Sequence, residues 1–353
     1  MAAPILPLDH LVARIADKPV ALADLARVLL AKGDEANARA LAAKALSLAP
    51  LDGEVASMAA EVMGYGVPAW HFHIVRDGAR NAAYDDALRR AVKPGMRVLE
   101  IGAGTGLLAM MAARAGAREV VTCEMNLAVA EAATRVVAAN GYADRVRVIA
   151  RSSADLEPAT DLGGGVDLIV SEIVSNDLVG EGVLPTMEQA MRRLANAGAV
   201  AIPAHGAVRV ALAHDAGLGA ERMAQVDGFD LSAFNELAPP RHRIRPDDQR
   251  LTLRSEPGDL FAFDFQSGGP FPQSRVAISL AANGGPVNGV AQWIALRMDD
   301  VGRYENLPGP GRRSAWGVLF YPLARPIDPR PGQSVTVRGA HDRQRLRIWA
   351  EAG

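Results

Sequence analysis

The sequence predicts an α/β domain built on a parallel sheet, preceded by a small all-α region and followed by an antiparallel β-sandwich or barrel. Residues 97–101 (RVLEI) form a short apolar run, and a glycine-rich loop and an apolar helix pattern follow it. Strand and helix patterns alternate up to about residue 200, which favours parallel strand pairing. After that point, short strands broken by Gly, Pro and Asp indicate an antiparallel sandwich or barrel. We therefore expect three regions, at residues 1–66, 67–200 and 201–353.

The first region, residues 1–66, is predicted to be helical and contains one stretch with tetratricopeptide-like spacing. The positions that match this spacing are Leu22, Leu25, Ala26, Leu29, Gly33, Ala38, Ala45 and Pro50. One such repeat cannot bury its apolar face alone, so it must pack on a neighbour. Two interpretations stay open: a docking surface for a partner chain, or a helical cap over the α/β domain.

The loop after residue 101 has glycines at Gly102, Gly104 and Gly106, with Thr105 between the last two. Glycines at a strand-to-helix turn let backbone amides approach a ligand closely. The spacing differs from the G-x-G-x-x-G of dinucleotide-binding proteins, which disfavours a nicotinamide cofactor. Glu100 adds a carboxylate that suits a ligand with an ammonium group.

A second predicted strand, residues 119–123, ends at Glu124. This acid lies roughly 20 residues beyond the glycines, where a carboxylate can bind ribose hydroxyls. The glycine loop and the two acids together indicate S-adenosyl-L-methionine as the cofactor.

Two glutamates nine positions apart, Glu172 and Glu181, follow the predicted strand VDLIV. Two carboxylates can grip a planar guanidinium from both sides, because it offers five donors in a fixed fork. Taken alone, the pair is more typical of solvated loop residues. However, the glycine loop, Glu124 and this pair all follow strand ends. They are therefore expected to meet at one edge of the sheet.

The composition limits the other possibilities. The chain has 353 residues, of which 49% are hydrophobic and 22% charged, as in ordinary soluble globular proteins. A net charge of −2 does not favour nucleic-acid binding. Cys123 is the only cysteine, and the histidines have no metal-ligand spacing, so we expect no metal. The sequence shows neither an apolar run of membrane-spanning length nor a signal-peptide pattern, so we expect a cytoplasmic protein. The excess of arginine over lysine suggests a bacterial source.

The order E-x-G-x-G-x-G, then C-E, then S-E-x8-E, then a barrel with a long insertion resembles the protein arginine methyltransferase family. The resemblance runs from about residue 67 to the C-terminus and looks closest to the monomethylating (type III) branch. The tetratricopeptide-like extension is instead similar to a symmetric-dimethylating branch. The resemblance implies a class I methyltransferase Rossmann-like sheet, a β-barrel and a dimerisation arm at about residues 217–247. It also implies a homodimer formed through this arm.

The resemblance also implies roles for individual residues. In the family's first helix, Arg80 would bind the methionine carboxylate of the cofactor. Glu124 would hold the ribose, and Ser153 would lie beside the adenine. The first strand and its loop would contribute Glu100, Gly102, Gly104, Thr105 and Gly106. Glu172 would be the main clamp for the guanidinium, and Glu181 would polarise the attacking nitrogen. The substrate pocket would be formed by residues of the first helix and the barrel, namely His71, Ile74, Asp77 and Trp316. Pro203 stands where the family joins its two halves, often through a cis peptide.

Two positions depart from the family pattern. Ala315 stands where the family commonly has a histidine that pairs with the helix carboxylate, here Asp77. Ile74 replaces a methionine that helps to decide how many methyl groups are added. Both changes leave the choice between mono- and dimethylation open.

The sequence therefore predicts an S-adenosylmethionine-dependent N-methyltransferase that acts on arginine in a protein or peptide. One alternative is free L-arginine or a small guanidine, whose α-carboxylate would need a partner such as Arg241, Arg243 or Arg245. A second alternative, from another class, is a non-catalytic adaptor that uses the helical repeat.

Overall fold

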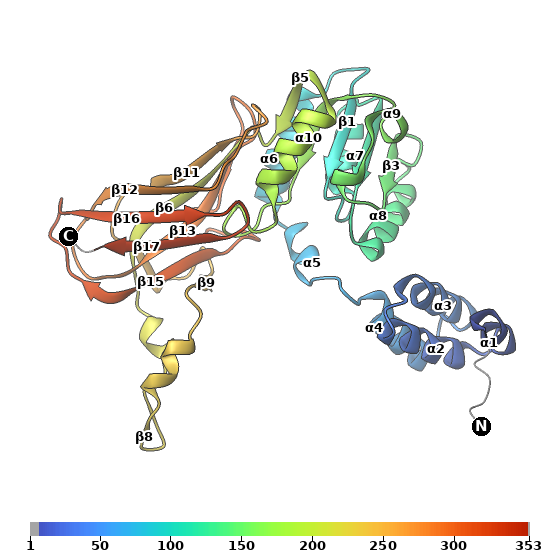
Figure 1. The fold of residues 1–353 in the computed structure, drawn as a ribbon, viewed down its shortest axis with the longest axis horizontal. Helices are drawn as coiled ribbons and strands as arrows, with labels where there is room; N and C mark the ends of the chain where they lie inside the picture. The colour runs from blue at the N-terminus through green and yellow to red at the C-terminus, as the bar shows by residue number, and fades with distance from the viewer. Residues whose placement is uncertain (1–6, 352–353) are drawn as a thin grey trace. The chain divides into compact units, whose positions relative to one another are not determined.

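The computed structural model describes residues 7–351, without the side chains of residues 220 and 221. The chain divides into two compact units, Met1–Pro68 and Ala69–Gly353 (Figure 1). Among the described residues, no helix is long and apolar enough to cross a membrane.

The first unit consists of four helices: α1 (Leu8–Arg14), α2 (Pro19–Ala31), α3 (Glu35–Leu48) and α4 (Gly53–Met63). Pro19 begins α2, and the side chains of Asp34 and Asp52 accept hydrogen bonds from the first turns of α3 and α4. The small and apolar faces of α2, α3 and α4 pack into one core. This core contains Leu22, Ala26, Ala38 and Ala45 of the predicted repeat. The assignment to the tetratricopeptide class stays a prediction.

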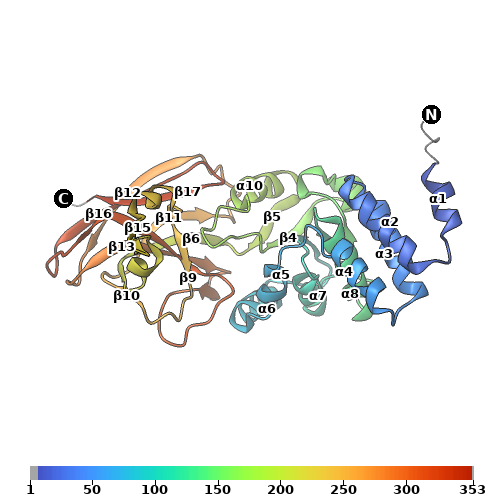
Figure 2. The same ribbon diagram turned by 90° about the horizontal axis from the view of Figure 1, so that it is seen from below.

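The second unit begins with two helices and a five-stranded parallel sheet in the order β3-β2-β1-β4-β5. The strands are β1 (Arg97–Ile101), β2 (Glu119–Cys123), β3 (Val146–Ile149), β4 (Val166–Ser171) and β5 (Ala195–Ile202). The helices are α5 (Trp70–Ile74), α6 (Gly78–Ala91), α7 (Leu107–Arg114), α8 (Leu127–Ala139), α9 (Pro158–Asp161) and α10 (Val183–Arg193). In Figure 2, α10 lies on one side of β4 and β5, and α6 and α7 lie on the other. The predicted α/β domain is therefore confirmed.

Residues 71–80, which the family resemblance assigns to one helix, belong to two helices, α5 and α6. The Asp77 side chain accepts a hydrogen bond from the backbone N–H of Arg80 (2.9 Å), which caps α6 and separates it from α5. Asp-Gly at residues 77 and 78 is a typical helix start, and it is the local signal for this break.

The second half of this unit contains the predicted antiparallel strands. A seven-stranded sheet has the path β10-β6-β13-β15-β9, with β11 paired to β6 and β14 to β13, and a three-stranded sheet has the order β12-β16-β17. The larger sheet contains β6 (His205–Asp215), β9 (His242–Ile244), β10 (Leu251–Leu253), β11 (Gly258–Asp264), β13 (Val287–Arg297), β14 (Arg303–Glu305) and β15 (Val318–Ile327). The smaller one contains β12 (Ser274–Ala281), β16 (Ser334–His341) and β17 (Leu346–Glu351). The Ile202–Pro203 peptide, between the two halves, is cis.

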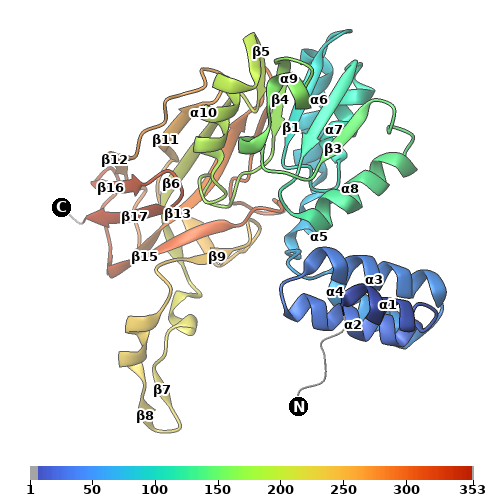
Figure 3. The same ribbon diagram turned by 45° about the vertical axis from the view of Figure 1, so that its right-hand side comes forward.

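The long insertion between β6 and β10 projects from the barrel (Figure 3). It contains the hairpin β7 (Gln225–Val226) and β8 (Phe229–Asp230), which precedes the short 3₁₀ helix Ser232–Leu237. The chain then returns to the barrel as β9, which pairs with β15. This return brings Arg241 within hydrogen-bond distance of Asp177, in the loop after β4.

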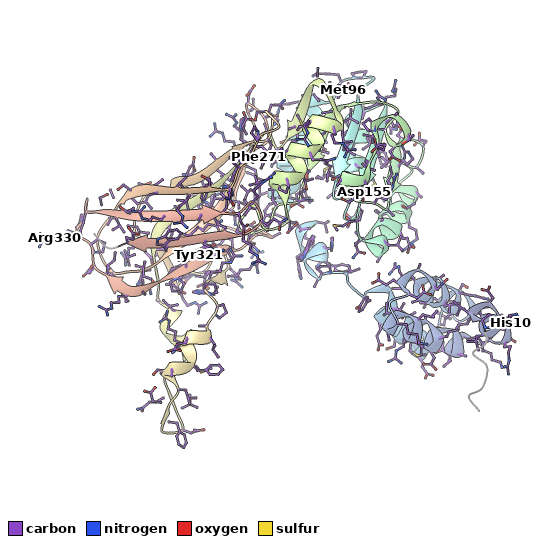
Figure 4. All side chains as sticks on the ribbon, viewed as in Figure 1. His10, Met96, Asp155, Phe271, Tyr321 and Arg330 are labelled. Carbon is purple, nitrogen blue, oxygen red and sulfur yellow. The ribbon has the colours of Figure 1, made fainter. Side chains whose placement is uncertain are left out.

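One hydrophobic core continues from the parallel sheet into the barrel. It joins Leu99 and Ile169 of the sheet to Phe265 and Ile294 of the barrel strands and their loops. Phe271 lies where the two halves meet (Figure 4), and its backbone N–H donates to Glu188 of α10 (3.3 Å). The two halves are thus packed against each other, so the parallel sheet and the barrel can build one site. Cys123 is buried in this core, and burial raises the pKa of its thiol to about 12.

Candidate active site

The carboxyl edge of the parallel sheet brings together the glycine loop, Glu124 and the loop from Glu172 to Glu181, called the double-glutamate loop below, as the sequence predicts. β1, β2 and β4 are neighbours in the sheet, and each of these segments follows the end of one of them. Met96, which precedes β1, lies at the opposite edge (Figure 4). This convergence places the candidate site at one edge of the sheet.

The glycine loop leaves open space beside the backbone. Gly102, Gly104 and Gly106 have positive φ angles of 85°, 52° and 78°. A Cβ atom on Gly102 would lie 2.7 Å from the Ile173 side chain, whereas one on Gly104 would meet nothing within 4 Å. Gly106 ends the loop and α7 starts at the next residue. Thr105 is half-buried within the loop.

Two acidic side chains face this loop from neighbouring strands. Glu124 accepts hydrogen bonds from the backbone N–H of Gly104 (3.2 Å) and of Asn126 (2.9 Å). Glu100 is 1% exposed, and its Oε2 atom has no hydrogen-bond partner among the described residues. Burial raises the pKa of Glu100 to about 8. A buried carboxylate oxygen without a partner among the described residues fits a ligand that supplies a polar group there.

Two further site residues are His71, predicted to line the substrate pocket, and Ser153, predicted to lie beside the adenine. Burial lowers the pKa of His71 in α5, and the nearby Glu124 carboxylate opposes this effect. Ser153 is buried in the turn after β3. Together with the open space at Gly104, these groups fit S-adenosylmethionine. Its ribose hydroxyls and ammonium group would meet carboxylates, with little steric hindrance from the loop backbone.

Arg80 links the first helices to the double-glutamate loop. Its Nη2 donates to Glu172 Oε2 at 2.6 Å, and its Nη1 donates to Asn81 (2.8 Å). The Nε atom is buried without a hydrogen-bond partner in the described part of the chain. The predicted role of Arg80, binding the methionine carboxylate, stays a prediction. The structure shows that Arg80 forms a buried ion pair with Glu172.

The two glutamates of the clamp differ in environment. Glu172 is buried beside Arg80, and burial raises its pKa to about 7, against the attraction of Arg80. Glu181 is exposed at the loop surface and pairs with no cation in the described structure. Its pKa is raised by partial desolvation and then by the nearby Asp177 carboxylate. One of these two carboxylates is therefore already paired, and the other has no cationic partner among the described residues.

The double-glutamate loop is held in shape by its own polar groups. The Ser175 hydroxyl donates to Asp177 Oδ1 (2.6 Å), and the backbone N–H of Gly180 lies within hydrogen-bond distance of both side chains. A Cβ on Gly180 would lie 2.8 Å from the Ser175 hydroxyl. Glycine is therefore required at this close approach.

The barrel also holds this loop. Trp316 donates its indole N–H to the carbonyl of Val174 (2.7 Å), and the Gly317 backbone N–H donates to Asn176 (2.6 Å). Gln292 donates to the carbonyl of Asn176 (3.0 Å). Trp316 is buried and positions the loop, whereas Trp70 and Phe72 of α5 are exposed. Ile74 is partly buried against the main core.

Asp77 finds a partner that the sequence did not indicate. Tyr304 of β14 donates its hydroxyl to Asp77 Oδ2 (2.7 Å), and the backbone N–H of Ala315 donates to the same oxygen (3.0 Å). The Tyr304 hydroxyl also lies 2.6 Å from the Ser314 hydroxyl. Tyr304 thus supplies the link between helix and barrel that Ala315 cannot supply through a side chain. Its only sequence signal was the unpaired Asp77.

No group of three or more His, Cys, Asp or Glu side chains is placed to hold a metal ion within residues 7–351.

Comparisons with known proteins agree with this geometry. Residues 86–204 match the sequence profile of the ribosomal protein L11 methyltransferase (PrmA) family. An arginine N(omega)-methyltransferase of Streptomyces achromogenes subsp. streptozoticus is 36% identical over 323 residues, which cover 89% of this chain and 88% of that protein. Protein arginine N-methyltransferase 7 of Oryza sativa subsp. indica is 32% identical over 272 residues. This match covers 69% of this chain but only 37% of the relative's length.

Solved structures share the fold. The Trypanosoma brucei PRMT1 enzyme-prozyme heterotetrameric complex with AdoHcy has a TM-score of 0.70 at 21% sequence identity, covering 81% of this chain and 99% of that chain. The structure of Arabidopsis thaliana protein arginine methyltransferase 10 has a TM-score of 0.63 at 19% sequence identity, and the match covers 76% of this chain and 86% of that chain. S-adenosylmethionine is the methyl donor of this enzyme class. From the sheet edge, the barrel and the near full-length match to a relative, we conclude that the chain belongs to the arginine N-methyltransferase family.

Proposed function

We propose that this chain transfers a methyl group from S-adenosylmethionine to a terminal guanidino nitrogen of arginine, with Glu172 and Glu181 as the clamp. The observation that supports this most directly is the asymmetry of the two glutamates. Glu172 is buried and paired with Arg80, whereas Glu181 is exposed and lacks a cationic partner among the described residues. A guanidinium placed between them would pair with Glu181 and share Glu172 with Arg80.

The clamp supplies what the reaction needs. A guanidinium has a pKa above about 12 and no free lone pair, so a nitrogen becomes nucleophilic only when the charge is localised elsewhere in the group. Bound S-adenosylmethionine supplies a methyl group on a positively charged sulfur. Glu172 orients the guanidinium, and Glu181 accepts the proton that the attacking nitrogen releases as its bond to the methyl carbon forms. The carbon–sulfur bond breaks in the same step. Positioning and electrostatic stabilisation account for most of the acceleration.

For the substrate, we favour free L-arginine or a small guanidine over arginine in a protein. The Streptomyces relative is named an arginine N(omega)-methyltransferase, and the match extends over nearly the full length of both chains. The match to the protein arginine methyltransferase from Oryza covers about a third of that protein. Arginine in a protein or peptide remains the second candidate, because a relative named protein arginine N-methyltransferase 7 is 32% identical over 69% of this chain.

The arm between β6 and β10 supports self-association. It exposes apolar side chains that are unusual on a monomer surface. Those at least 40% exposed are Met223, Val226, Phe229, Leu231, Phe234 and Leu237. The Trypanosoma structure is described as a heterotetrameric complex, so assembly occurs within this fold. We assign this arm to a homodimer interface.

The function is tested by incubating the purified chain with methyl-labelled S-adenosylmethionine and, separately, L-arginine and an arginine-rich peptide. Products are identified by mass spectrometry, and Glu181→Gln serves as the inactive control. We expect methylarginine, with its mass giving the number of methyl groups. Label on neither substrate, from a chain that binds the cofactor, would contradict the proposal. A chain that does not bind the cofactor would instead support the adaptor interpretation.

A further inference from the structure

Arg241 lies against the double-glutamate loop although it is far from it in sequence. The arm returns to the barrel just before β9, and there Arg241 Nη1 donates to Asp177 Oδ2 (2.7 Å) and to the Tyr321 hydroxyl (2.9 Å). Both partners are buried, at 3% and 5% exposure. These two bonds fix the orientation of the guanidinium.

The other edge of this guanidinium is free. The Arg241 side chain is 35% exposed, and its Nε and Nη2 atoms make no hydrogen bond to any residue that the structure describes. Two parallel N–H groups on one edge of a guanidinium match the two oxygens of a carboxylate. The pKa of Arg241 is raised because its bonds to Tyr321 and Asp177 outweigh the opposing effect of burial. The group is therefore a permanently charged, pre-oriented anion receptor.

The neighbouring arginines do not share this position. The Nη2 atom of Arg243 donates to the carbonyl of Ala315 (2.9 Å), and Arg245 is 76% exposed and pairs with Asp247. Arg241 is thus the one member of the three that contacts the double-glutamate loop.

Asp177 connects Arg241 to the clamp. The Asp177 carboxylate accepts hydrogen bonds from the Ser175 hydroxyl and from the backbone N–H of Gly180, and Glu181 directly follows Gly180. Asp177 lies near enough to Glu181 to raise the pKa of that carboxyl group. Arg241 is therefore joined through Asp177 to the turn that carries Glu181.

We propose that Arg241 binds the α-carboxylate of a free arginine whose guanidinium is held by Glu172 and Glu181. This inference rests on the proposed function and names the residue that selects the substrate class. An arginine inside a peptide has a neutral amide in place of the carboxylate, and an amide offers no charge to the free edge of Arg241. The site therefore selects guanidines that end in a carboxylate.

The first test uses the unaltered protein and four substrates. L-arginine is compared with agmatine, which lacks the carboxylate, with L-argininamide, in which it is neutral, and with a peptide containing one internal arginine. We expect kcat/KM for agmatine and argininamide to be lower by about 10- to 100-fold, chiefly through KM, because the carboxylate contact is the same before and during methyl transfer. Agmatine or the peptide being used as efficiently as arginine would overturn the inference and leave the proposed function standing. Methylation of none of the four would overturn both.

The second test assigns the selectivity to Arg241. In the double variant Arg241→Gln with Asp177→Asn, no buried carboxylate is left without a partner, so the loop is kept intact. We expect the preference for arginine over agmatine to fall to within about threefold of unity. The control pair Arg245→Gln with Asp247→Asn removes the same two charges from an ion pair on the same return of the arm, so it should retain the preference. Retained preference in the double variant would assign carboxylate binding to another group and refute the role of Arg241.

Discussion

The hydrogen bond between Tyr304 and Asp77 joins the barrel to the start of α6, and its free energy can be estimated from the structure. The Tyr304 side chain is buried, and its ring packs on Trp316 at 5.3 Å between centroids. Tyr304→Phe keeps this ring and leaves no cavity, so the change removes only the hydroxyl. A hydrogen bond to a carboxylate contributes about 1.5–3 kcal/mol. Asp77 would retain the backbone N–H groups of Arg80 and Ala315, so we expect a loss near 1.5–2 kcal/mol.

A double-mutant cycle isolates this interaction. Tyr304→Phe, Asp77→Asn and the combined variant are unfolded in urea and followed by tryptophan fluorescence. The four tryptophans, at positions 70, 293, 316 and 349, all lie in the second unit, so the signal reports that unit alone. We expect a coupling free energy of about 1–2 kcal/mol. The control Asp300→Asn, at an exposed position of the second unit, should change stability by less than about 0.5 kcal/mol. A coupling free energy below about 0.5 kcal/mol would show that Tyr304 does not replace the missing histidine as the partner of Asp77.

Three other predictions concern the clamp and the arm. Because burial raises the pKa of Glu172 to about 7 and the clamp needs the carboxylate, kcat/KM should rise with pH and level off above about 7; a flat profile between about pH 5 and 8 would contradict this. The same raised pKa means that the folded state binds this proton more tightly than the unfolded state. The free energy of unfolding should therefore fall as the pH rises from about 4.5, the ordinary pKa of a glutamate, to about 7. Glu172→Gln should reduce that fall in urea titrations. Glu181→Gln should lower turnover by at least about 100-fold while calorimetry shows nearly unchanged S-adenosylmethionine binding; retained turnover would remove Glu181 from the mechanism. Phe229 and Phe234 are 71% and 62% exposed, and replacing both with serine should convert the dimer to a monomer in sedimentation. If the unaltered chain is already a monomer, the assignment of the arm to a dimer interface is wrong.

Local sequence determined the parts of the site that follow strand ends. Glycines 102, 104 and 106, Glu124 and the pair Glu172 and Glu181 each follow a predicted strand, and parallel topology alone brings them to one edge. The helix break at Asp77 was also encoded locally, by Asp followed by Gly, although the segment was predicted as one helix.

Contacts between distant segments were decided only by the tertiary structure. Tyr304 and Asp77 are separated by 227 positions, Arg80 and Glu172 by 92, and Arg241 and Asp177 by 64. Strand and helix periodicity determine which face a side chain occupies, but not which residue of another element meets it. The arrangement of the barrel against the sheet selects Tyr304 for Asp77 and Arg241 for Asp177. Local motifs in a known topology were therefore sufficient to predict the family, and the clamp stays a prediction from the same motifs. The partners that tune the clamp depend on how the two halves pack, and this packing follows from a core shared between the sheet and the barrel.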